Sequence, residues 1–282
     1  MSGTLYLVAT PIGNLEDLSF RALRMLKEAD LIACEDTRTS AHLLRAYEID
    51  TPTTSYHKFN EEEKGEVLLG KLLAGENIAL ISDAGTPAIS DPGEILVRKC
   101  LENGVPVTSV PGPNACITAL TLSGRSTRRF AFEGFLPQET KEKAAVLAEL
   151  RKETRTIVLY EAPHRLGKTL RALAETLGEA RGITLVRELT KRFETVTRAT
   201  LGEALLSLEE TPPRGEYVLV IDGKSPEEIR AEEAGKWETM SIADHVRFYE
   251  EAGHDWKEAM RLAAKDRGLS KRDIYQALLE KQ

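Results

Sequence analysis

The sequence predicts an α/β protein with two α/β domains and a small helical region at the C-terminal end. Short apolar runs of β character alternate with helical stretches along most of the chain, which is the pattern of sheets layered with helices. The chain has 282 residues, more than one compact core usually supports. After Gly223 the composition shifts to Lys, Glu and Ala. We therefore expect domains at 1–122, 130–223 and 236–282, with a small, polar, basic linker at 123–129.

The first domain is expected to open directly on a strand and then to alternate strands with helices. Four apolar runs are short enough for buried strands, and five longer stretches suit helices. The expected strands are Leu5–Ala9, Leu31–Cys34, Asn77–Ser82 and Val107–Val110, and the expected helices are Ser19–Ala29, Ser40–Tyr47, Glu62–Ala74, Gly93–Asn103 and Asn114–Leu122.

The second domain repeats this alternation with four strands and three helices. The expected strands are Phe130–Phe135, Thr156–Tyr160, Gly182–Arg187 and Glu216–Asp222, and the helices between them are Glu139–Lys152, Arg165–Leu177 and Leu201–Leu208.

The C-terminal region carries helix-start signals instead of strand signals. Ser241 is followed three residues later by Asp244, and Ser270 by Asp273, which resembles a capping box with Asp in place of Glu or Gln. Gly268 breaks the helix before it. Helices at Glu258–Asp266 and Ser270–Glu280 would have helix-turn-helix proportions, which many helical hairpins share without contacting nucleic acid.

Composition excludes several classes of protein. The net charge of −7 argues against a protein that coats nucleic acid, because phosphate attraction needs a basic surface, although one local basic face stays compatible with it. No apolar run is long enough for a membrane span, and the start lacks the pattern of a signal peptide, so we expect a cytoplasmic protein without a membrane partner. The three cysteines and five histidines show no disulfide or metal-ligand spacing, so no metal is expected.

Three loops rich in Gly and Pro follow three strands of the first domain, at 9–14, 82–93 and 110–115. Ligands of open α/β sheets bind beyond the carboxyl ends of strands, so these loops are expected to line one crevice. Their small residues expose backbone groups that suit an adenosine and an amino-acid moiety. Asn114 is expected to cap the following helix and leave its first N–H groups for a ligand. The first loop is not G-x-G-x-x-G, so NAD binding is not expected.

Taken together, these loops and several further segments resemble the tetrapyrrole methylase superfamily. More narrowly, the chain is similar to the bacterial 16S rRNA (cytidine-2′-O)-methyltransferase family from about residue 4 to about residue 223. Besides the loops, the segments that carry this resemblance are Glu35-Asp36-Thr37-Arg38, His57-Lys58-Phe59-Asn60-Glu61, Phe132-Glu133-Gly134-Phe135-Leu136-Pro137, Tyr160-Glu161-Ala162-Pro163-His164-Arg165 and Arg187-Glu188-Leu189-Thr190-Lys191.

The resemblance implies two α/β domains with S-adenosylmethionine in the cleft between them, in a protein that is usually a homodimer. Related enzymes for corrins and porphyrins carry Gly-Asp-Pro in the second loop, whereas this chain has Ser82-Asp83-Ala84, which favours the branch that modifies RNA. The substrate implied is a cytidine ribose in the decoding centre of 16S rRNA, within the small ribosomal subunit. The expected cofactor-binding residues are Pro11, Ile12, Gly13, Asp83, Gly85, Thr86, Pro87, Asn114, Ala115, Tyr160, Arg187 and Tyr217.

Methyl transfer to a ribose hydroxyl is an in-line displacement, which a positioned base assists by taking the hydroxyl proton. The candidate catalytic residues are Glu35, Asp36, His57, Glu161 and Lys191, with Glu61, His164 and Glu188 close to them in the sequence. A structural alternative is that Glu35 and Asp36 hold Arg38 in place. The candidate RNA-binding residues are Arg38 and Arg165, with Arg187 as a further phosphate anchor, and Lys271 and Arg272 at the start of the last helix.

Two other functions share this scaffold. One is a methyltransferase for a small tetrapyrrole-like substrate, which needs no basic face. The other is a non-catalytic factor that binds the ribosome. Fold alone does not separate them, because function depends on the site.

Overall fold

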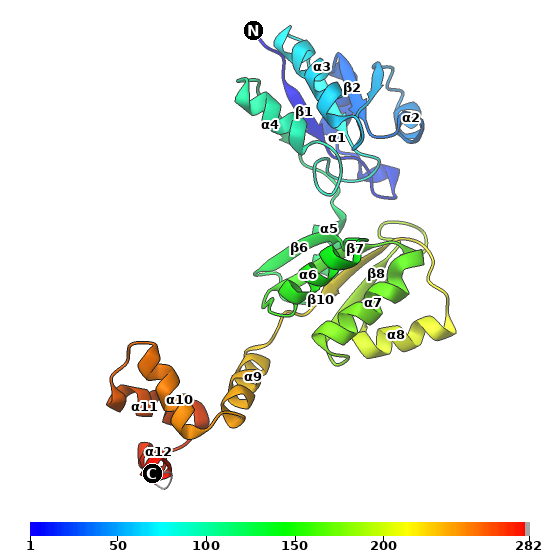
Figure 1. Ribbon diagram of the computed structural model, residues 1–282. Coiled ribbons are helices and arrows are strands. Elements are labelled where there is room, and N and C mark those ends of the chain that lie inside the picture. Colours follow the sequence, from blue (N-terminus) through cyan, green and yellow to red (C-terminus); the bar gives the residue numbers. More distant parts are fainter. Residues whose placement is uncertain (280–282) are drawn as a thin grey trace. The chain divides into compact units, whose positions relative to one another are not determined.

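The computed structural model describes residues 1–279 and divides into two compact units, Met1–Gly223 and Lys224–Gln282. The first unit contains two separate five-stranded sheets, each with helices packed against it (Figure 1). The second unit is helical throughout its described part. The predicted α/β class with a helical C-terminal region is therefore confirmed.

The first sheet is entirely parallel, in the order β3-β2-β4-β1-β5. Because all strands run the same way, their carboxyl ends lie along one edge. β3 was not predicted, since its three residues Thr-Thr-Ser contain no apolar run. The strands are β1 (Leu5–Val8), β2 (Leu31–Cys34), β3 (Thr53–Ser55), β4 (Ile78–Ile81) and β5 (Val107–Val110).

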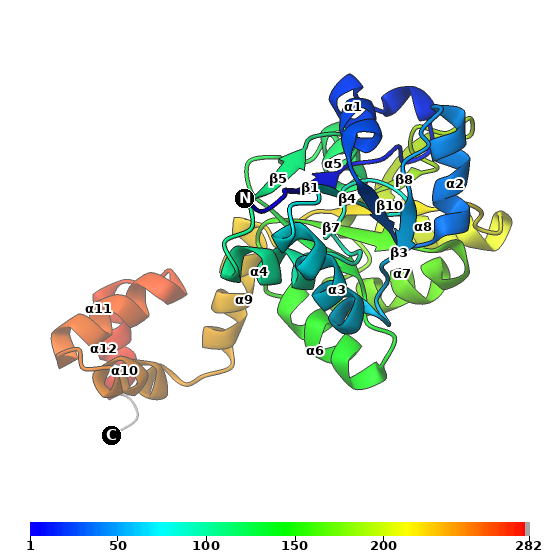
Figure 2. The ribbon, with the colours of Figure 1, turned by 90° about the horizontal axis from the view of Figure 1, so that it is seen from above.

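Helices cover both faces of this sheet, as its nearly continuous apolar strands require. One face packs on α3 and α4, and the other on α1 and α2, which Figure 2 shows on opposite sides of the strands. Ser19 and Asp36 cap α1 and α2 by accepting hydrogen bonds from backbone N–H groups. The bounds are η1 (Leu15–Asp17, a 3₁₀ turn), α1 (Phe20–Glu28), α2 (Thr37–Ala46), α3 (Glu61–Leu73) and α4 (Glu94–Glu102).

The second sheet is mixed, in the order β6-β7-β10-β8-β9. β6 and β7 are parallel, and the other neighbours are antiparallel. The edge strand β9 was not predicted, because its sequence Thr-Val-Thr-Arg-Ala-Thr is mostly polar and exposed. The strands are β6 (Phe130–Phe135), β7 (Thr156–Glu161), β8 (Gly182–Arg187), β9 (Thr195–Thr200) and β10 (Tyr217–Ile221).

Alternate residues of these strands face two apolar layers. Ile157, Leu159, Leu219 and Ile221 pack with α6 (Thr140–Leu150), α7 (Pro163–Leu177) and α8 (Leu201–Glu210). Val158, Val186, Val218 and Val220 pack on the other face against α5 (Ala115–Ser123).

The position of α5 differs from the expected domain division. We predicted it as the last helix of the first domain, but its apolar residues Cys116, Ala119 and Leu120 pack on the second sheet. The divide between the two sheets therefore falls in the loop at 111–114, not at 123–129.

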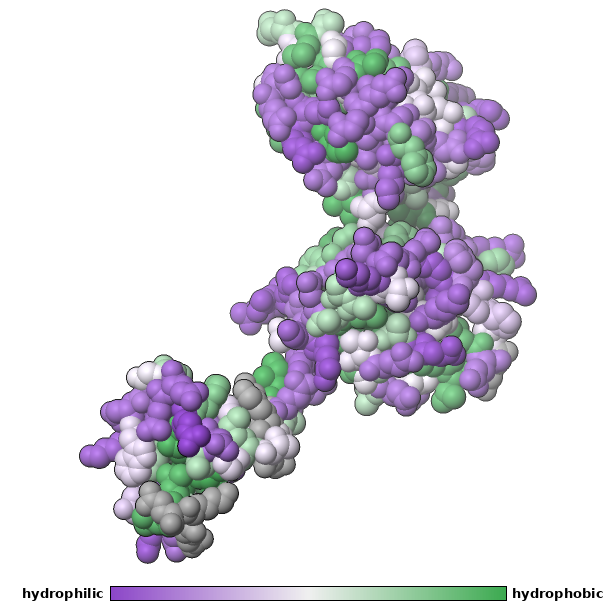
Figure 3. All heavy atoms as spheres, viewed as in Figure 1, coloured by the Kyte–Doolittle hydropathy of each residue, from purple (hydrophilic) through white to green (hydrophobic). Residues whose placement is uncertain are grey.

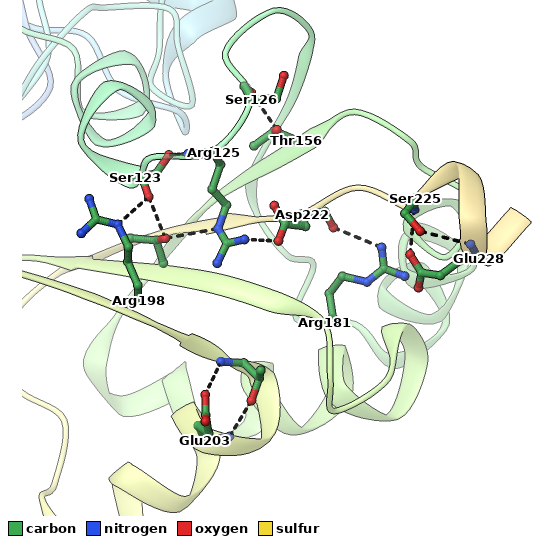
Figure 4. A network of polar contacts seen from close by, with 12 residues as sticks. Ser123, Arg125, Ser126, Thr156, Arg181, Arg198, Glu203, Asp222, Ser225 and Glu228 are labelled. Atoms are coloured by element: carbon green, nitrogen blue, oxygen red, sulfur yellow. Dashed lines mark hydrogen bonds and ion pairs between the residues drawn. The ribbon is translucent and has the colours of Figure 1, made fainter.

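The segment expected to be a linker is instead held to the second sheet (Figure 4). Arg125 forms an ion pair with Asp222 and donates to the Thr184 hydroxyl at 3.2 Å. The Ser123 carbonyl accepts a hydrogen bond from Arg198 at 3.0 Å. The Arg125 side chain is only 14% exposed, so these contacts hold the segment against the sheet.

The second unit consists of α9 (Pro226–Glu238), α10 (Ile242–Glu251), α11 (Trp256–Arg267) and α12 (Lys271–Leu279). It has a core of its own, in which α10, α11 and α12 bury residues such as Val246, Met260 and Ile274. The predicted reciprocal cap is present, since Ser270 and Asp273 each accept the other's backbone N–H. α9 was not predicted, and Glu280 of the expected last helix lies outside the described residues.

Hydrophilic residues cover most of the face of the first unit that Figure 3 shows. The apolar side chains are gathered in the five clusters that the sheets and helices bury. No helix in the described part of the chain is long and apolar enough to cross a membrane.

Candidate functional site

The three Gly/Pro-rich loops of the first unit converge at the carboxyl edge of the first sheet. They follow β1, β4 and β5, which are adjacent in the order β4-β1-β5. Adjacent parallel strands deliver their following loops to the same place, which is where open α/β sheets bind ligands. The topology thus explains why segments separated by about a hundred residues meet.

Hydrogen bonds tie these loops to one another. Thr10 and Gly85 exchange two backbone hydrogen bonds, at 2.8 and 3.0 Å, which join the first loop to the second. The Thr86 hydroxyl donates to the Pro113 carbonyl at 3.1 Å and accepts from the Asn114 amide at 3.3 Å, which joins the second loop to the third. The loops therefore form one preorganised wall.

The second loop adopts backbone conformations that favour glycine. Gly85 has φ +82°, and a Cβ added there would lie 3.3 Å from Cγ2 of Ile12. Ala88 and Ser90 also have positive φ, +65° and +66°, although neither is glycine. Such strain persists only where the surroundings impose it, and it concentrates at functional sites.

The second sheet contributes the opposite wall. Because β10 runs antiparallel to β7 and β8, the start of β10 lies beside their carboxyl ends, with Tyr217 opposite Glu161 and Arg187. Tyr160 projects from the end of β7, and its hydroxyl accepts a hydrogen bond from the Cys116 N–H at 3.1 Å. This bond uses one of the helix-start N–H groups that we had expected to face a ligand, and Asn114 caps the next one, on Ile117.

These walls enclose a cavity of about 280 Å³, near the lower end of the range for small-molecule pockets. Both sheets contribute to its lining. The lining residues are Ile12, Asp83, Ala84, Gly85, Thr86, Ile89, Ser90, Asp91, Asn114, Ala115, Phe135, Tyr160, Glu161, Ala162, Val186, Leu189, Glu216, Tyr217 and Val218.

The cavity combines apolar walls with carboxylates. Asp91 is half-buried, and burial raises its pKa to about 6, with a smaller contribution from the nearby charge of Asp83. Asp83 lies more exposed and also has a raised pKa, chiefly from desolvation. Its carboxylate accepts the Asp36 N–H at 3.2 Å. Two carboxylates beside apolar surface suit a ligand that combines an aromatic part with positive charge.

Most of the residues predicted to bind a cofactor lie in this cavity. Four do not line it, and each has another environment. Pro11 and Pro87 are buried in their loops, and the Arg187 guanidinium donates to the Arg214 carbonyl at 2.6 Å. Gly13 lies against the next loop, where a Cβ would come within 2.5 Å of Cγ of Lys191. The eight that line the cavity are Ile12, Asp83, Gly85, Thr86, Asn114, Ala115, Tyr160 and Tyr217.

Three of the predicted catalytic side chains are engaged with other protein groups. Asp36 caps α2 and pairs with Arg38 at 3.0 Å, the structural arrangement considered as the alternative. Lys191 pairs with Glu188 and Glu216 at 3.1 and 2.8 Å. The buried Glu161 lines the cavity, but its carboxylate accepts hydrogen bonds from the Thr169 hydroxyl and from the Ala162 N–H.

His57 and Glu35 are less constrained. The His57 ring contacts the Asn60 amide at 3.3 Å through Nε2, and its buried Nδ1 has no hydrogen-bond partner among the described residues. The Glu35 carboxylate forms no ion pair within the described part of the chain. Burial raises its pKa, and the charges of Asp91 and Asp83 raise it further. Glu35 therefore lies within electrostatic range of the cavity carboxylates Asp83 and Asp91 and has no ion-pair partner among the described residues.

The predicted RNA-binding arginines of the first unit differ in their surroundings. The Arg38 side chain is 91% exposed. Arg165 instead points inward, because the buried Glu161 carboxylate at the end of β7 lies 3.3 Å away and the Leu136 carbonyl accepts a second hydrogen bond. In this arrangement the guanidinium neutralises a buried charge, and its contact with a phosphate stays a prediction.

Sequence reasoning missed several residues of the cavity. Asp91 belongs to the second loop, but nothing in the local sequence indicated that its carboxylate would be half-buried beside Asp83. Phe135, Val186 and Leu189 were read only as strand or loop residues, although a carboxyl-end position could have marked them.

Fold and cavity define a class of protein, and the chain belongs to the tetrapyrrole (corrin/porphyrin) methylase family, which residues 4–205 match. Curated relatives extend over nearly the whole chain. A ribosomal RNA small subunit methyltransferase I of Bacillus subtilis (strain 168) is 48% identical over 280 residues, which cover 99% of this chain and 95% of that protein. The protein of the same name from Escherichia coli O157:H7 is 44% identical over 283 residues, covering 99% and 96%.

Solved structures share the fold at lower identity. The uroporphyrin-III C-methyl transferase of Thermus thermophilus, complexed with S-adenyl homocysteine, has a TM-score of 0.56 and 23% identity, covering 78% of this chain and 97% of that chain. A cobalt precorrin-4 methyltransferase has a TM-score of 0.55 and 20% identity, covering 77% and 94%. The predicted family and fold class are confirmed, and both findings agree with the predicted S-adenosylmethionine cofactor.

Proposed function

We propose that this protein transfers a methyl group from S-adenosylmethionine to the RNA of the small ribosomal subunit. The observation that carries this proposal is the relationship, at 42–48% identity, to proteins named ribosomal RNA small subunit methyltransferase I. The cavity supports it, because its lining comes from the loops that the resemblance assigned to the cofactor.

The residues of the cavity fit S-adenosylmethionine. Apolar side chains such as Ile12, Val186 and Leu189 offer a surface for the adenine ring. Asp83 and Asp91 supply negative charge for a ligand that carries a sulfonium and an ammonium group. The tied loops hold backbone groups in place before binding, which lowers the entropic cost of recognition.

The bound cofactor supplies an electrophilic methyl group on a positively charged sulfur. The protein's part is to hold the accepting oxygen in line with that methyl group and to receive the hydroxyl proton. We assign proton acceptance to Glu35, because it combines a raised pKa with a carboxylate not engaged in any ion pair of the described residues. Arg38 is our candidate for contacting a phosphate beside the target, since its exposed guanidinium can still reach solvent.

We further propose that the acceptor is the ribose 2′-hydroxyl of a cytidine in the decoding centre of 16S rRNA, as the resemblance implies. To reach the cavity, the target cytidine must be unstacked from its neighbours in the rRNA. Proteins recognise such unpaired nucleotides through exposed aromatic and basic side chains.

The experiment that tests the class of reaction offers the protein two alternative acceptors. Purified protein is incubated with methyl-labelled S-adenosylmethionine and either small ribosomal subunits or a tetrapyrrole. We expect label in the rRNA alone. Label in the tetrapyrrole would favour the small-molecule function, and cofactor binding without any transfer would favour a non-catalytic ribosome-binding factor.

A further inference from the structure

We propose that the second unit carries a docking site for single-stranded RNA, formed by exposed side chains of α11 and α12. We call it the α11–α12 surface. This proposal rests on the proposed function and adds to it the surface that binds the RNA substrate outside the cavity. Its residues are Trp256, Lys257, Lys271, Arg272 and Tyr275.

Two aromatic rings form the apolar part of this surface. Trp256 begins α11 and Tyr275 lies on α12, and their ring centroids are 6.0 Å apart in an edge-to-face arrangement. The two residues remain 45% and 46% exposed. Rings that pack against each other yet stay half-exposed offer free π faces, and nucleobases stack on such faces without regard to sequence.

The charges of α11 and α12 are unbalanced in favour of cations. Residues 256–279 contain six Lys or Arg side chains and three carboxylates. Lys257, Lys265, Lys271 and Arg272 are exposed and form no ion pair among the residues that the structure describes. A protein with a net charge of −7 thus presents a local basic face here, as attraction to phosphates requires.

Each of the three carboxylates has a partner within the unit, and the cations outnumber them six to three. Glu258 pairs with Arg261 at 2.6 Å, Asp266 lies 3.3 Å from His245, and Asp273 accepts the Ser270 N–H. The Arg261 hydrogen bond lowers the pKa of Glu258, and the charge of Lys271 contributes too. Lys271 therefore lies within electrostatic range of Glu258, which is in the first turn of α11.

The geometry favours unpaired RNA over duplex RNA or a protein partner. The deep, narrow major groove of an A-form duplex does not admit side chains, whereas unpaired bases can stack on aromatic rings. Cations beside the rings match the phosphates that flank each base. A protein partner would be expected to cover the rings with apolar surface and to leave the four free cations without a role.

The test uses the full chain and a single-stranded oligocytidylate of about ten nucleotides, within the usual site size for such surfaces. We expect the oligonucleotide to quench tryptophan emission, because a stacked base contacts Trp256. Trp237, the only other tryptophan in the sequence, is 8% exposed and stacks on His245. Trp256→Phe should abolish the quench. A quench that persists in this variant would contradict the proposal.

Affinity measured by fluorescence polarisation separates stacking from charge. Trp256→Leu and Tyr275→Ala should each weaken binding about 10-fold, the usual effect of losing one stacking contact. Reversing Lys271 and Arg272 to Glu should weaken binding and flatten its salt dependence. The matched controls, Phe20→Ala and Arg247→Glu, change exposed residues outside this surface and should bind as the parent does.

Three results would overturn the inference. One is parental affinity in both aromatic variants. Another is equal binding of a duplex of the same length. The third is a set of variants that bind the oligonucleotide with parental affinity but bind whole ribosomal subunits more weakly, which would indicate that a ribosomal protein is the partner. Calorimetry with S-adenosylmethionine on the same variants tests the proposed function separately, and the cofactor affinity should not change. If the protein bound RNA at the α11–α12 surface but transferred no methyl group, the proposed function would fail and this inference would stand.

Discussion

The cavity of the first unit and the α11–α12 surface are built for ligands in opposite ways. The cavity consists of short side chains and exposed backbone on loops that are hydrogen-bonded to one another. The α11–α12 surface consists of long, exposed side chains on helices. One arrangement fixes a small ligand by its shape, and the other attracts an extended polyanion.

The cavity and the α11–α12 surface also differ in the sign of their charge. Carboxylates surround the cavity, with Asp83 and Asp91 in its lining and Glu35 within electrostatic range. Cations without an ion-pair partner among the described residues lie on the same two helices as Trp256 and Tyr275. The comparison teaches that an acidic chain can act on RNA if it separates a negative site for a cationic cofactor from a positive site for phosphates. A substitution in one site should therefore leave ligand binding at the other unchanged.

The largest effect is expected from Glu35→Gln. Removing the proton acceptor should lower kcat about 10²- to 10⁴-fold, the usual contribution of a general base. Because the raised pKa means that the carboxylate becomes ionised only at higher pH, kcat of the parent should fall as pH falls, and the variant should lose this dependence. Single-turnover kinetics would measure both. A variant with parental kcat would remove Glu35 from the mechanism.

Gly85→Leu should weaken cofactor binding by about 100-fold or more. The positive φ of Gly85 strains any side chain, and the added atoms would meet Ile12 inside the cavity. Calorimetry with S-adenosylmethionine is the measurement, and oligonucleotide affinity is the control, which should not change. Unchanged cofactor affinity would show that the second loop does not form the binding site.

Asp91→Asn should weaken binding of S-adenosylmethionine about 10-fold, which is one pKa unit of interaction energy. S-adenosylhomocysteine lacks the sulfonium charge, so its affinity should fall less. The pKa of Asp91, about 6, also predicts that the parent loses affinity for S-adenosylmethionine as pH drops through 6, because protonation removes the negative charge. Equal losses for both ligands would show that Asp91 does not contact the positive charge.

Arg38→Ala should have the smallest effect on activity, a few-fold rise in KM for the subunit with unchanged cofactor affinity, because one phosphate contact contributes modestly.

Arg165→Ala is the contrasting variant. It leaves the Glu161 charge buried without its partner, so it should lower the free energy of unfolding by about 3 kcal/mol. If Arg165→Ala is as stable as the parent but fails to bind RNA, Arg165 acts by contacting RNA and not by pairing with Glu161.

The sequence predicted strands that contain apolar residues better than strands that are mostly polar. The bounds of β2, β5, β6 and β8 agree with the expected ones, although β5 and β6 are sheet edges. The two missed strands, β3 and β9, are both sheet edges with polar, exposed sequences. Their pairing depends on a neighbour distant in sequence, which local periodicity does not report.

The candidate site shows the same division. The three loops were predictable, since Gly and Pro mark strand ends from local sequence alone. The half-burial of Asp91 was not, because it depends on loops brought together by strand order. The inward orientation of Arg165 was not predictable from helix spacing, because its partner Glu161 ends the strand β7 and does not belong to the helix.

Methylation of a ribose on small-subunit RNA is tested most directly by locating the methyl group. Small subunits lacking the modification are incubated with the protein and methyl-labelled S-adenosylmethionine, and the 16S rRNA is digested and analysed by mass spectrometry of nucleosides. We predict labelled 2′-O-methylcytidine from the decoding centre, absent with Glu35→Gln. Label on a base atom, or no label in the RNA, would contradict the account.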